Sequence, residues 1–437
     1  MSFYAPSYPL ARDTVDTKAP GTGKHIWQIL AGAVGNVLEW YDFAAYGYFA
    51  SALAKNFFPS ENAALSLAST FGVFAAAFLM RPIGGALFGH VGDRFGRKQA
   101  LLTSAGLMTL ATFAMGLLPN YAVVGAAAPL LLIGFRLLQG LSIGGEFTAS
   151  AVFLVERSDP RHRGLTGSFA SVSATVGLLL GSGIGVIATW VLTPAQVDAW
   201  GWRIPFLLGI LLGAFALFLR RIIVDDEPRH EAEQRRLPVV EALATDWPDI
   251  LRGAVMGAAF AAGFYLIFVY VVTMVEQIDD MPAHPALEIN TLSMLVLVAA
   301  TPCFGALSDR LGRKPVLLAS LAGLVLFSWP LFKLLLSPSF LTVLLGQSMF
   351  ALIAAAWFGT IQAALVEMFR SRTRCTALSI SYNVAYAVFG GTAPIIAIYL
   401  VNRLHADFGP AFFLMVIGAI SFVAVLTMPD RTGQPLR

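Results

Sequence analysis

Two carboxylic acids lie in the middle of a long apolar stretch near the start of the chain. Glu39 and Asp42 fall within residues 27–53, a run long enough to cross a bilayer as a helix. At about 100° per residue, these acids share one helix face with Tyr46, and Asn36 lies at its edge. A carboxylate at mid-membrane costs about 2.5–3.5 kcal/mol. The pair therefore needs a partner, a proton or water. This predicts a proton or substrate site that faces an internal cavity; carboxyls satisfied by helix packing alone are the alternative.

An arginine in a later apolar stretch is a candidate partner for these acids. Arg136 opens a polar face on the predicted span 124–154, and Gln139 follows it on the same face. A guanidinium stays protonated and offers a planar fork that fits a carboxylate. Arg136 could therefore pair with Asp42 or Glu39, or hold an anionic substrate after protonation of the acid releases it. A permanent structural ion pair is the alternative.

Two further charged residues lie nearer the ends of their apolar stretches. Arg81 could supply a second cation for a di- or tricarboxylate, or it could snorkel to the membrane interface. Glu146 could take part in proton coupling or pair with a loop arginine. Facing lipid without partners, the five buried charges of this half would cost roughly 12–18 kcal/mol. We therefore expect all five to surround a shared interior.

Composition assigns the chain to the integral membrane proteins. Of its 437 residues, 57% are hydrophobic and 13% are charged, whereas soluble domains carry about 25% charged residues. Cys303 and Cys375 are its two cysteines, so no disulfide framework is expected. We find no nucleotide-binding motif, no metal-ligand spacing and no convincing triad, so neither an enzyme nor a cofactor or metal site is expected. No nucleic-acid partner is expected either.

Twelve membrane spans can be assigned from the apolar stretches. They cover residues 27–53, 66–89, 98–118, 124–154, 164–190, 203–222, 250–277, 287–307, 314–335, 339–367, 374–402 and 408–428. With the N-terminus inside, 23 of the 29 lysines and arginines fall in cytoplasmic segments, four in outer segments and two in the membrane. This asymmetry follows the positive-inside rule. We expect a multi-pass protein of a bacterial inner membrane with both termini in the cytoplasm.

A repeated motif divides the chain into two halves. The stretch Gly89–Lys98 returns as Gly305–Lys314, 216 residues later, with the pattern Gly-x-x-x-Asp-Arg-x-Gly-Arg-Lys in both copies. The copies keep the same orientation, which predicts two six-helix bundles related by an axis along the membrane normal. The expected units are an N-terminal half over residues 1–222, a charged cytoplasmic linker over 223–249 and a C-terminal half over 250–437.

Several separate motifs resemble one known family. The all-α arrangement of twelve spans in two bundles, with the repeated motif, resembles the major facilitator superfamily. Within it, the chain is similar to the metabolite:H+ symporter family in four stretches, namely Gly35–Asp42, Arg81–Gly85, Arg136–Glu146 and Trp202–Phe206. That family includes permeases for α-ketoglutarate, citrate and shikimate and for the osmolytes proline and betaine. The resemblance covers nearly the whole chain.

The resemblance also implies a role for the repeated motif. In the family, this loop latches the two halves together on the cytoplasmic side, which would give a gate role to Asp93, Arg94 and Arg97, and to Asp309 and Arg310 in the second copy. Glycines permit the close turn, and an aspartate can pair with arginines and with a neighbouring helix N-terminus. A positively charged topology determinant is the alternative.

The second half offers polar and aromatic side chains rather than mid-helix charges. They are expected to form the uncharged wall of a small-molecule site, and comprise Tyr265, Trp357, Tyr382, Asn383 and Tyr386. On the first half, Arg136, Arg81, Asn36, Tyr46 and Gln139 complete the predicted substrate site, and Glu39, Asp42 and Glu146 are the predicted proton-coupling residues. Ordinary packing is the alternative for each aromatic ring.

These observations predict a monomeric secondary transporter that rocks two halves around a central site. Two membrane arginines in one half favour proton-coupled import of a small organic acid, such as a di- or tricarboxylate. The long coiled-coil tail of the family's osmosensing members has no counterpart after Met428, which also favours an organic anion. A proton-coupled symporter of proline or betaine is the alternative. A drug/proton antiporter and a membrane sensor are less favoured.

Overall fold

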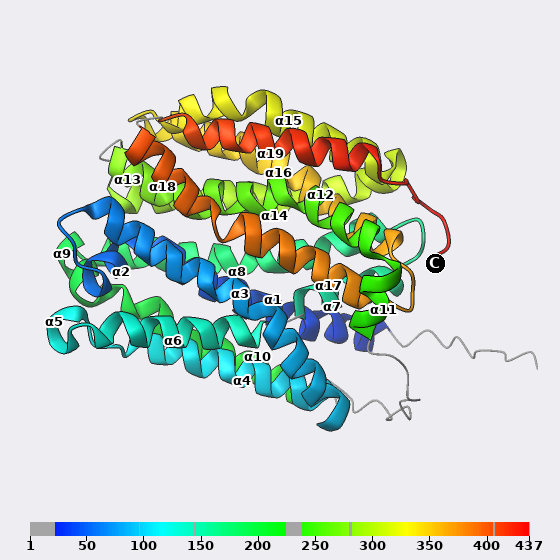
Figure 1. Ribbon diagram of the computed structural model, residues 1–437, viewed down its shortest axis with the longest axis horizontal. Helices are drawn as coiled ribbons and strands as arrows, with labels where there is room; N and C mark the ends of the chain where they lie inside the picture. The colour runs from blue at the N-terminus through cyan, green and yellow to red at the C-terminus, as the bar shows by residue number, and fades with distance from the viewer. Residues whose placement is uncertain are drawn as a thin grey trace, which may run out of the picture.

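Helices that run side by side make up the regular structure in the part of the chain described by this computed structural model (Figure 1). The description covers residues 22–95, 97–143, 146–223, 238–278, 282–404 and 407–436. The elements before the predicted linker are α1 (Thr22–Tyr48), α2 (Ala50–Phe57), α3 (Ala63–Phe95), α4 (Arg97–Gly116), α5 (Tyr121–Val124), α6 (Ala127–Ser142), α7 (Glu146–Glu156), α8 (Arg163–Val191), α9 (Pro194–Gln196), the π-helix η1 (Val197–Gly201) and α10 (Arg203–Ile223).

The elements after residue 237 form a second series. They are α11 (Pro238–Thr245), α12 (Trp247–Tyr265), the π-helix η2 (Leu266–Tyr270), α13 (Val271–Ile278), α14 (Ala283–Leu311), α15 (Arg313–Leu335), α16 (Phe340–Met368), α17 (Arg374–Ala385), the π-helix η3 (Tyr386–Gly390), α18 (Ala393–Leu404) and α19 (Gly409–Leu426). Of the predicted linker, α11 is described and residues 224–237 lie outside the described residues.

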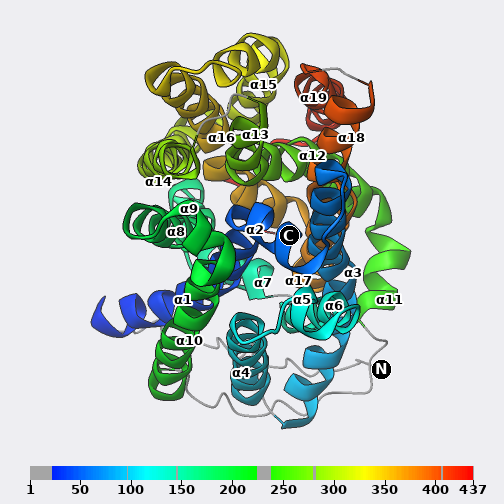
Figure 2. The same cartoon turned by 90° about the vertical axis from the view of Figure 1, so that its left-hand side faces the viewer.

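The helices pack as two groups that meet along two seams. In the first group α1 packs on α8, α4 on α10 and α3 on α6; in the second α14 and α15 pack on α16, and α12 packs on α17 and α19. The groups meet where α8 lies along α14 and α16, and where α3 meets η3 and α18 (Figure 2). Side chains at these seams can therefore come from both groups.

The number of membrane-crossing helices differs from the twelve predicted spans. Among the described residues, ten helical stretches are long and apolar enough to cross a membrane, and a pair bent by 53° between η1 and α10 makes an eleventh. The predicted span 27–53 is not one of these. Its residues lie in the 27-residue helix α1 and in α2, which are separated at Phe49.

The two ends of the bundle are distinguished by short elements. α11 and the C-terminus lie at one end, which we call the inner end because the charge distribution predicts that it faces the cytoplasm (Figure 1). The opposite end, called the outer end, carries α2, α5 and α9.

Two glycines of α8 allow α1 to pack closely against it. A Cβ at Gly177 would lie 2.4 Å from the carbonyl oxygen of Val37, and one at Gly181 would lie 2.5 Å from the Cβ of Ala44.

Candidate functional site

Two ion pairs lie side by side in the first group of helices. The Nη1 atom of Arg136 on α6 is 2.7 Å from Oδ2 of Asp42 on α1, and Nη2 of Arg81 on α3 is 2.5 Å from Oε1 of Glu39 on α1. All four residues are at most 4% exposed. Because Glu39 and Asp42 are three residues apart, they reach different neighbouring helices from one face of α1.

Asp42 is held by more than its arginine. Thr112 on α4 donates to Oδ1 at 2.9 Å, and the Nε2 of Gln139 donates to the same oxygen at 2.5 Å. The Oε1 of Gln139 in turn accepts a hydrogen bond from Arg136 at 2.9 Å. Both carboxylate oxygens therefore have partners, and Thr112 joins the site although its sequence context gave no signal for it.

Aromatic rings surround the guanidinium of Arg136. Its central carbon lies 4.4 Å from the ring centre of Phe43, 4.6 Å from that of Tyr46 and 5.2 Å from that of Phe74. Tyr46 is fixed by a hydrogen bond from its hydroxyl to the carbonyl oxygen of Thr70, at 2.9 Å. Nε and Nη2 of Arg136 are buried without a hydrogen-bond partner, so the guanidinium keeps two donors beyond its contact with Asp42.

The second ion pair is less completely bonded than the first. Oε2 of Glu39 and the Nε and Nη1 atoms of Arg81 are buried without hydrogen-bond partners. The Arg81 guanidinium lies 5.4 Å from the ring centre of Phe78 and 5.7 Å from that of Tyr382, which comes from α17 in the other group of helices. This ion pair therefore borders the seam between the two groups.

Trp40, which lies between the two acids on α1, is the centre of an aromatic cluster that crosses the seam. Its ring centre is 5.5 Å from that of Phe264, 6.3 Å from that of Tyr265, 6.0 Å from that of Tyr386 and 6.0 Å from that of Phe147. The indole Nε1 and the hydroxyl of Tyr265 are buried without hydrogen-bond partners. Trp40 was not among the predicted site residues, although its place between the acids could have indicated it.

Both tyrosines of this cluster adjoin a π-helix. Tyr265 is the last residue of α12, directly before η2, and Tyr386 is the first residue of η3. The extra residue of a π-turn interrupts the regular hydrogen bonding of a helix, and such turns occur frequently at functional sites. Two helices of the second group are therefore irregular where they face Trp40.

The remaining predicted residues take different positions. Asn36 donates to Ser150 at 2.9 Å and to Ser173 at 3.1 Å, so it ties α1 to α7 and α8. Tyr382 stacks on Tyr386 with ring centres 4.2 Å apart. Trp357 stacks on Phe260 at 4.8 Å and Asn383 donates to Ser379 at 3.2 Å, so these contacts lie within the second group of helices.

At the inner end, the second copy of the repeated motif contacts the first group of helices. The carboxylate of Asp309 accepts hydrogen bonds from the backbone N–H groups of Gly164 at 2.8 Å and Leu165 at 2.9 Å, at the start of α8. Asp309 also pairs with Arg313 at 2.7 Å, and Arg310, the other predicted gate residue of this copy, is exposed. Arg310 directly follows Asp309 and therefore projects about 100° away around α14.

Further contacts join the two groups at both ends. Near the inner end, Arg374 on α17 pairs with Glu156 on α7. Near the outer end, Ser51 on α2 donates to Glu276 on α13 at 3.2 Å. The side chains of four residues with predicted roles lie outside the described part of the structure, namely Asp93, Arg94, Arg97 and Glu146. In the described part, the two groups therefore touch on both sides of the central aromatic cluster.

Comparison with protein families and known proteins gives consistent matches along the chain. Residues 28–245 match the family model "Sugar (and other) transporter", and residues 286–437 match the model "Major Facilitator Superfamily". A putative proline/betaine transporter of Staphylococcus aureus (strain COL) is 34% identical over 416 residues, which cover 94% of this chain and 89% of that protein. The proline/betaine transporter of Escherichia coli (strain K12) is 31% identical over 429 residues, with 95% and 85% covered.

Solved structures confirm the predicted fold class. The proton:xylose symporter XylE bound to 6-bromo-6-deoxy-D-glucose superimposes with a TM-score of 0.76 at 19% identity, covering 95% of this chain and 98% of that one. A crystal structure of a D-xylose-proton symporter gives a TM-score of 0.75 at 20% identity, with 94% and 100% covered. At this level of identity, the likeness establishes the fold alone. Transport rather than enzymatic activity is what the model "Sugar (and other) transporter" and the names of these relatives describe.

Proposed function

Because the chain belongs to the major facilitator superfamily, we propose that it is a proton-coupled symporter of zwitterionic osmolytes of the proline and betaine class. Its site would lie in a bacterial cytoplasmic membrane, between two halves that open alternately to either side. The names of its relatives support this substrate class, and so does the charge balance of the site.

The pairing of the buried charges is the observation that carries this proposal. Arg136 is neutralised by Asp42 and Arg81 by Glu39, each at a distance of 2.7 Å or less. Two arginines in one half suggested a substrate with several negative charges, but neither arginine is left with an unbalanced charge. A site whose described charges already cancel favours a substrate whose own charges cancel, because burying an unpaired charge is costly.

Each end of a zwitterion would find a suitable group. The unpartnered Nε and Nη2 atoms of Arg136 are donors for a substrate carboxylate. The ring cluster around Trp40, with Tyr265 and Tyr386, offers the aromatic faces that attract quaternary ammonium groups. Substrate entry would require the rings of the two halves to separate, which the irregular turns at η2 and η3 would permit.

Proton coupling would follow from the same balance of charge. Protonation of either acid, Glu39 or Asp42, would leave the arginine paired with it with an uncompensated charge in a buried site, and a substrate carboxylate would restore neutrality. The proton and the substrate would therefore bind together more favourably than either alone, which is the condition for symport. The hydrogen bonds from Thr112 and Gln139 to Asp42 would orient this acid toward Arg136.

The contacts at the two ends would then act as alternating gates. The inner gate would comprise Asp309 with the start of α8, and Arg374 with Glu156. The outer gate would comprise Ser51 and Glu276. Opening one set while the other holds would expose the central site to one side of the membrane at a time.

Transport by purified protein in liposomes tests the substrate class. We expect an inward proton gradient to drive accumulation of labelled proline or glycine betaine, and a protonophore to abolish it. Unlabelled citrate and α-ketoglutarate should not compete. Uptake of citrate with no effect of betaine would favour an organic acid instead, and accumulation that ignores the proton gradient would refute symport.

A matched pair of tryptophan substitutions tests the aromatic part of the site. Trp40→Leu should weaken betaine binding about 2- to 30-fold, because a cation–π contact contributes roughly 0.5–2 kcal/mol. Trp357→Leu removes an equally large ring that stacks on Phe260 in the second half, and it should leave betaine affinity unchanged. Equal losses in both variants, measured by calorimetry, would contradict this assignment.

A further inference from the structure

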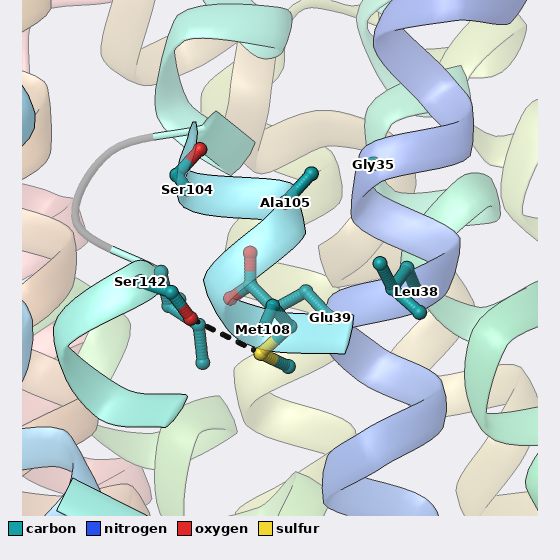
Figure 3. A pocket seen from close by; sticks show the side chains of 8 residues that line it. Gly35, Leu38, Glu39, Ser104, Ala105, Met108 and Ser142 are labelled. Atoms are coloured by element: carbon teal, nitrogen blue, oxygen red, sulfur yellow. Dashed lines mark hydrogen bonds between the residues drawn. The ribbon is translucent and has the colours of Figure 1, made fainter. Parts of the chain in front are cut away.

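A small pocket lies inside the first half, next to Glu39. Its lining residues come from α1, α4, the end of α6 and the residue after it, and are Gly35, Leu38, Glu39, Ser104, Ala105, Met108, Ser142 and Ile143. Figure 3 shows the Glu39 carboxylate between α1 and the hydrogen-bonded pair of Ser142 and Met108. The volume open to the centre of a water molecule is about 10 Å³, which is close to the space that one water requires.

The two buried acids differ in their access to this pocket. Glu39 lines it, and Oε2 of this residue is buried without a hydrogen-bond partner. Asp42 is not among the lining residues, and both of its oxygens accept hydrogen bonds from Arg136, Gln139 or Thr112. A proton arriving through the pocket would therefore meet an available acceptor on Glu39, whereas Asp42 is already enclosed by donors.

The pocket extends from Glu39 toward the inner end. Gly35 lies one turn before Glu39, on the side of α1 where the chain begins. Ser104 lies in the first half of α4, which begins at the inner end with Arg97, and Ser142 is the last residue of α6. All lining residues precede residue 144, so the pocket is built by one half alone. The pocket is therefore present without separation of the two halves.

We propose that Glu39 exchanges its proton with water at the inner end through this pocket, on a route separate from the passage of substrate between the halves. The inference rests on the proposed proton symport. In the release step, the protonated carboxyl of Glu39 gives its proton to a water molecule in the pocket. The resulting carboxylate then regains its full ion pair with Arg81. Ser104 and Ser142 supply hydroxyl groups along the way.

In the described part of the structure, other titratable groups lie near Glu39 on several elements. They are Asp42 on α1 itself, Arg81 from α3, Tyr265 from α12, and Tyr382 and Tyr386 from α17 and η3. Arg81 is the ion-pair partner of Glu39, while the three tyrosines are not among the residues that line the pocket. Among the described residues that line the pocket, Glu39 is therefore the one titratable group.

Filling the pocket should slow proton movement without affecting the substrate passage. In liposomes, Ser104→Leu should lower the rate of betaine uptake driven by a proton gradient about tenfold, somewhat less than the roughly 100-fold effect of removing a proton-transfer group. Exchange of labelled for unlabelled betaine at equal pH requires no net proton movement and should stay unchanged. The control is Thr103→Leu, because Thr103 is the neighbour of Ser104 on α4 and its side chain is exposed.

A second filling variant provides a measurement that does not depend on Ser104. Ala105 also lines the pocket, so Ala105→Leu should slow proton-driven uptake to a similar extent and leave exchange unchanged. Unchanged uptake by both leucine variants would overturn the route, as would an equal loss of uptake and exchange. If wild-type uptake ignores the proton gradient, the proposed symport itself fails, and this outcome is seen before any variant is made.

Discussion

The carboxylate of Asp309, at the end of α14, accepts a hydrogen bond from the backbone N–H of Gly164 at a distance of 2.8 Å. The first N–H groups of a helix have no partner within the helix and carry partial positive charge. An acid from one half of the protein thus completes a helix of the other half. Separation of the halves at the inner end must break this contact.

Removing the charge of Asp309 should favour separation of the inner end. Asp309→Asn replaces charge-assisted hydrogen bonds with neutral ones, a loss of about 1–2 kcal/mol, and should raise the ratio of inner-open to inner-closed molecules about 5- to 30-fold. Spin labels at the exposed positions His162 and Leu311 would report the distance distribution. Arg310→Gln is the control, since Arg310 is exposed, and an equal shift in this variant would contradict the assignment.

A glycine substitution tests the same seam by steric means. A Cβ at Gly164 would lie 2.4 Å from the carbonyl oxygen of Gly305, so α8 and α14 must move apart to accept it. Gly164→Ala should therefore also populate the inner-open state. Gly183 lies on the same helix, and a Cβ added there would meet no atom within 4 Å, so Gly183→Ala should leave the distances unchanged and stabilise the helix by up to about 1 kcal/mol. Identical behaviour of the two variants would be evidence against a tight inner seam.

The ion pair of Arg136 and Asp42 should be much more costly to break than an exposed one. Asp42→Asn leaves a buried guanidinium without its counter-charge, which costs about 3–5 kcal/mol. Adding Arg136→Gln should restore most of the stability but no transport. Lys55 and Asp198 form an exposed pair at 2.6 Å, and neutralising either should cost at most about 1 kcal/mol. Thermal unfolding in detergent measures the stability of the variants of both ion pairs. Similar losses of stability for the two pairs would show that the buried pair is hydrated.

The pH dependence of stability should include a contribution from Asp430. Its Oδ2 accepts from the backbone N–H of Lys314 at 3.1 Å, at the start of α15, and its Oδ1 accepts from the Thr432 hydroxyl at 2.6 Å. Partial burial raises the pKa of Asp430, but these hydrogen bonds outweigh burial and hold it below its ordinary value. A lowered pKa gives stability that is complete above the unfolded value of about 3.9 and is lost as pH falls through the folded value.

Asp430→Asn should therefore lower the free energy of unfolding by about 0.5–1 kcal/mol at pH 7, near the lower end for a helix cap because Asp430 is largely exposed. The difference from wild type should shrink as the pH falls below about 4. Thermal unfolding at both pH values measures it. Asp407→Asn serves as the control because Asp407 is also exposed, and a deficit in Asp430→Asn that is constant with pH would exclude the titration.

The charged site was largely predictable from the sequence because the membrane makes unpaired charge so costly. Glu39, Asp42, Arg81 and Arg136 had to find partners, and helical periodicity placed both acids on one face. The sequence could not say which acid meets which arginine. The pairing depends on how α3 and α6 are placed around α1. Because each arginine is paired with an acid, the site has no excess positive charge, and this charge was the reason for expecting an organic anion.

Other features of the site depend on contacts between residues far apart in the sequence, and no local sequence pattern indicated them. Thr112 is one of many threonines in apolar helices, and its role arises because α4 brings it to Asp42. The aromatic cluster joins Trp40 to rings more than 200 residues away. Similarly, the motif left open which arginine meets Asp309, and in the structure Arg313, directly after the glycine turn at residue 312 with φ of 100°, is the one that pairs with it.

The one-to-one matching of Arg81 with Glu39 and Arg136 with Asp42 has an electrical consequence. These four side chains together carry no net formal charge, so the unloaded carrier can reorient without their moving charge through the membrane field. The membrane potential, about 2.3 kcal/mol per elementary charge per 100 mV, would then act on this site only when a proton is bound. A zwitterionic substrate adds no net charge to the protonated carrier, so the transport current should equal one elementary charge for each proton moved.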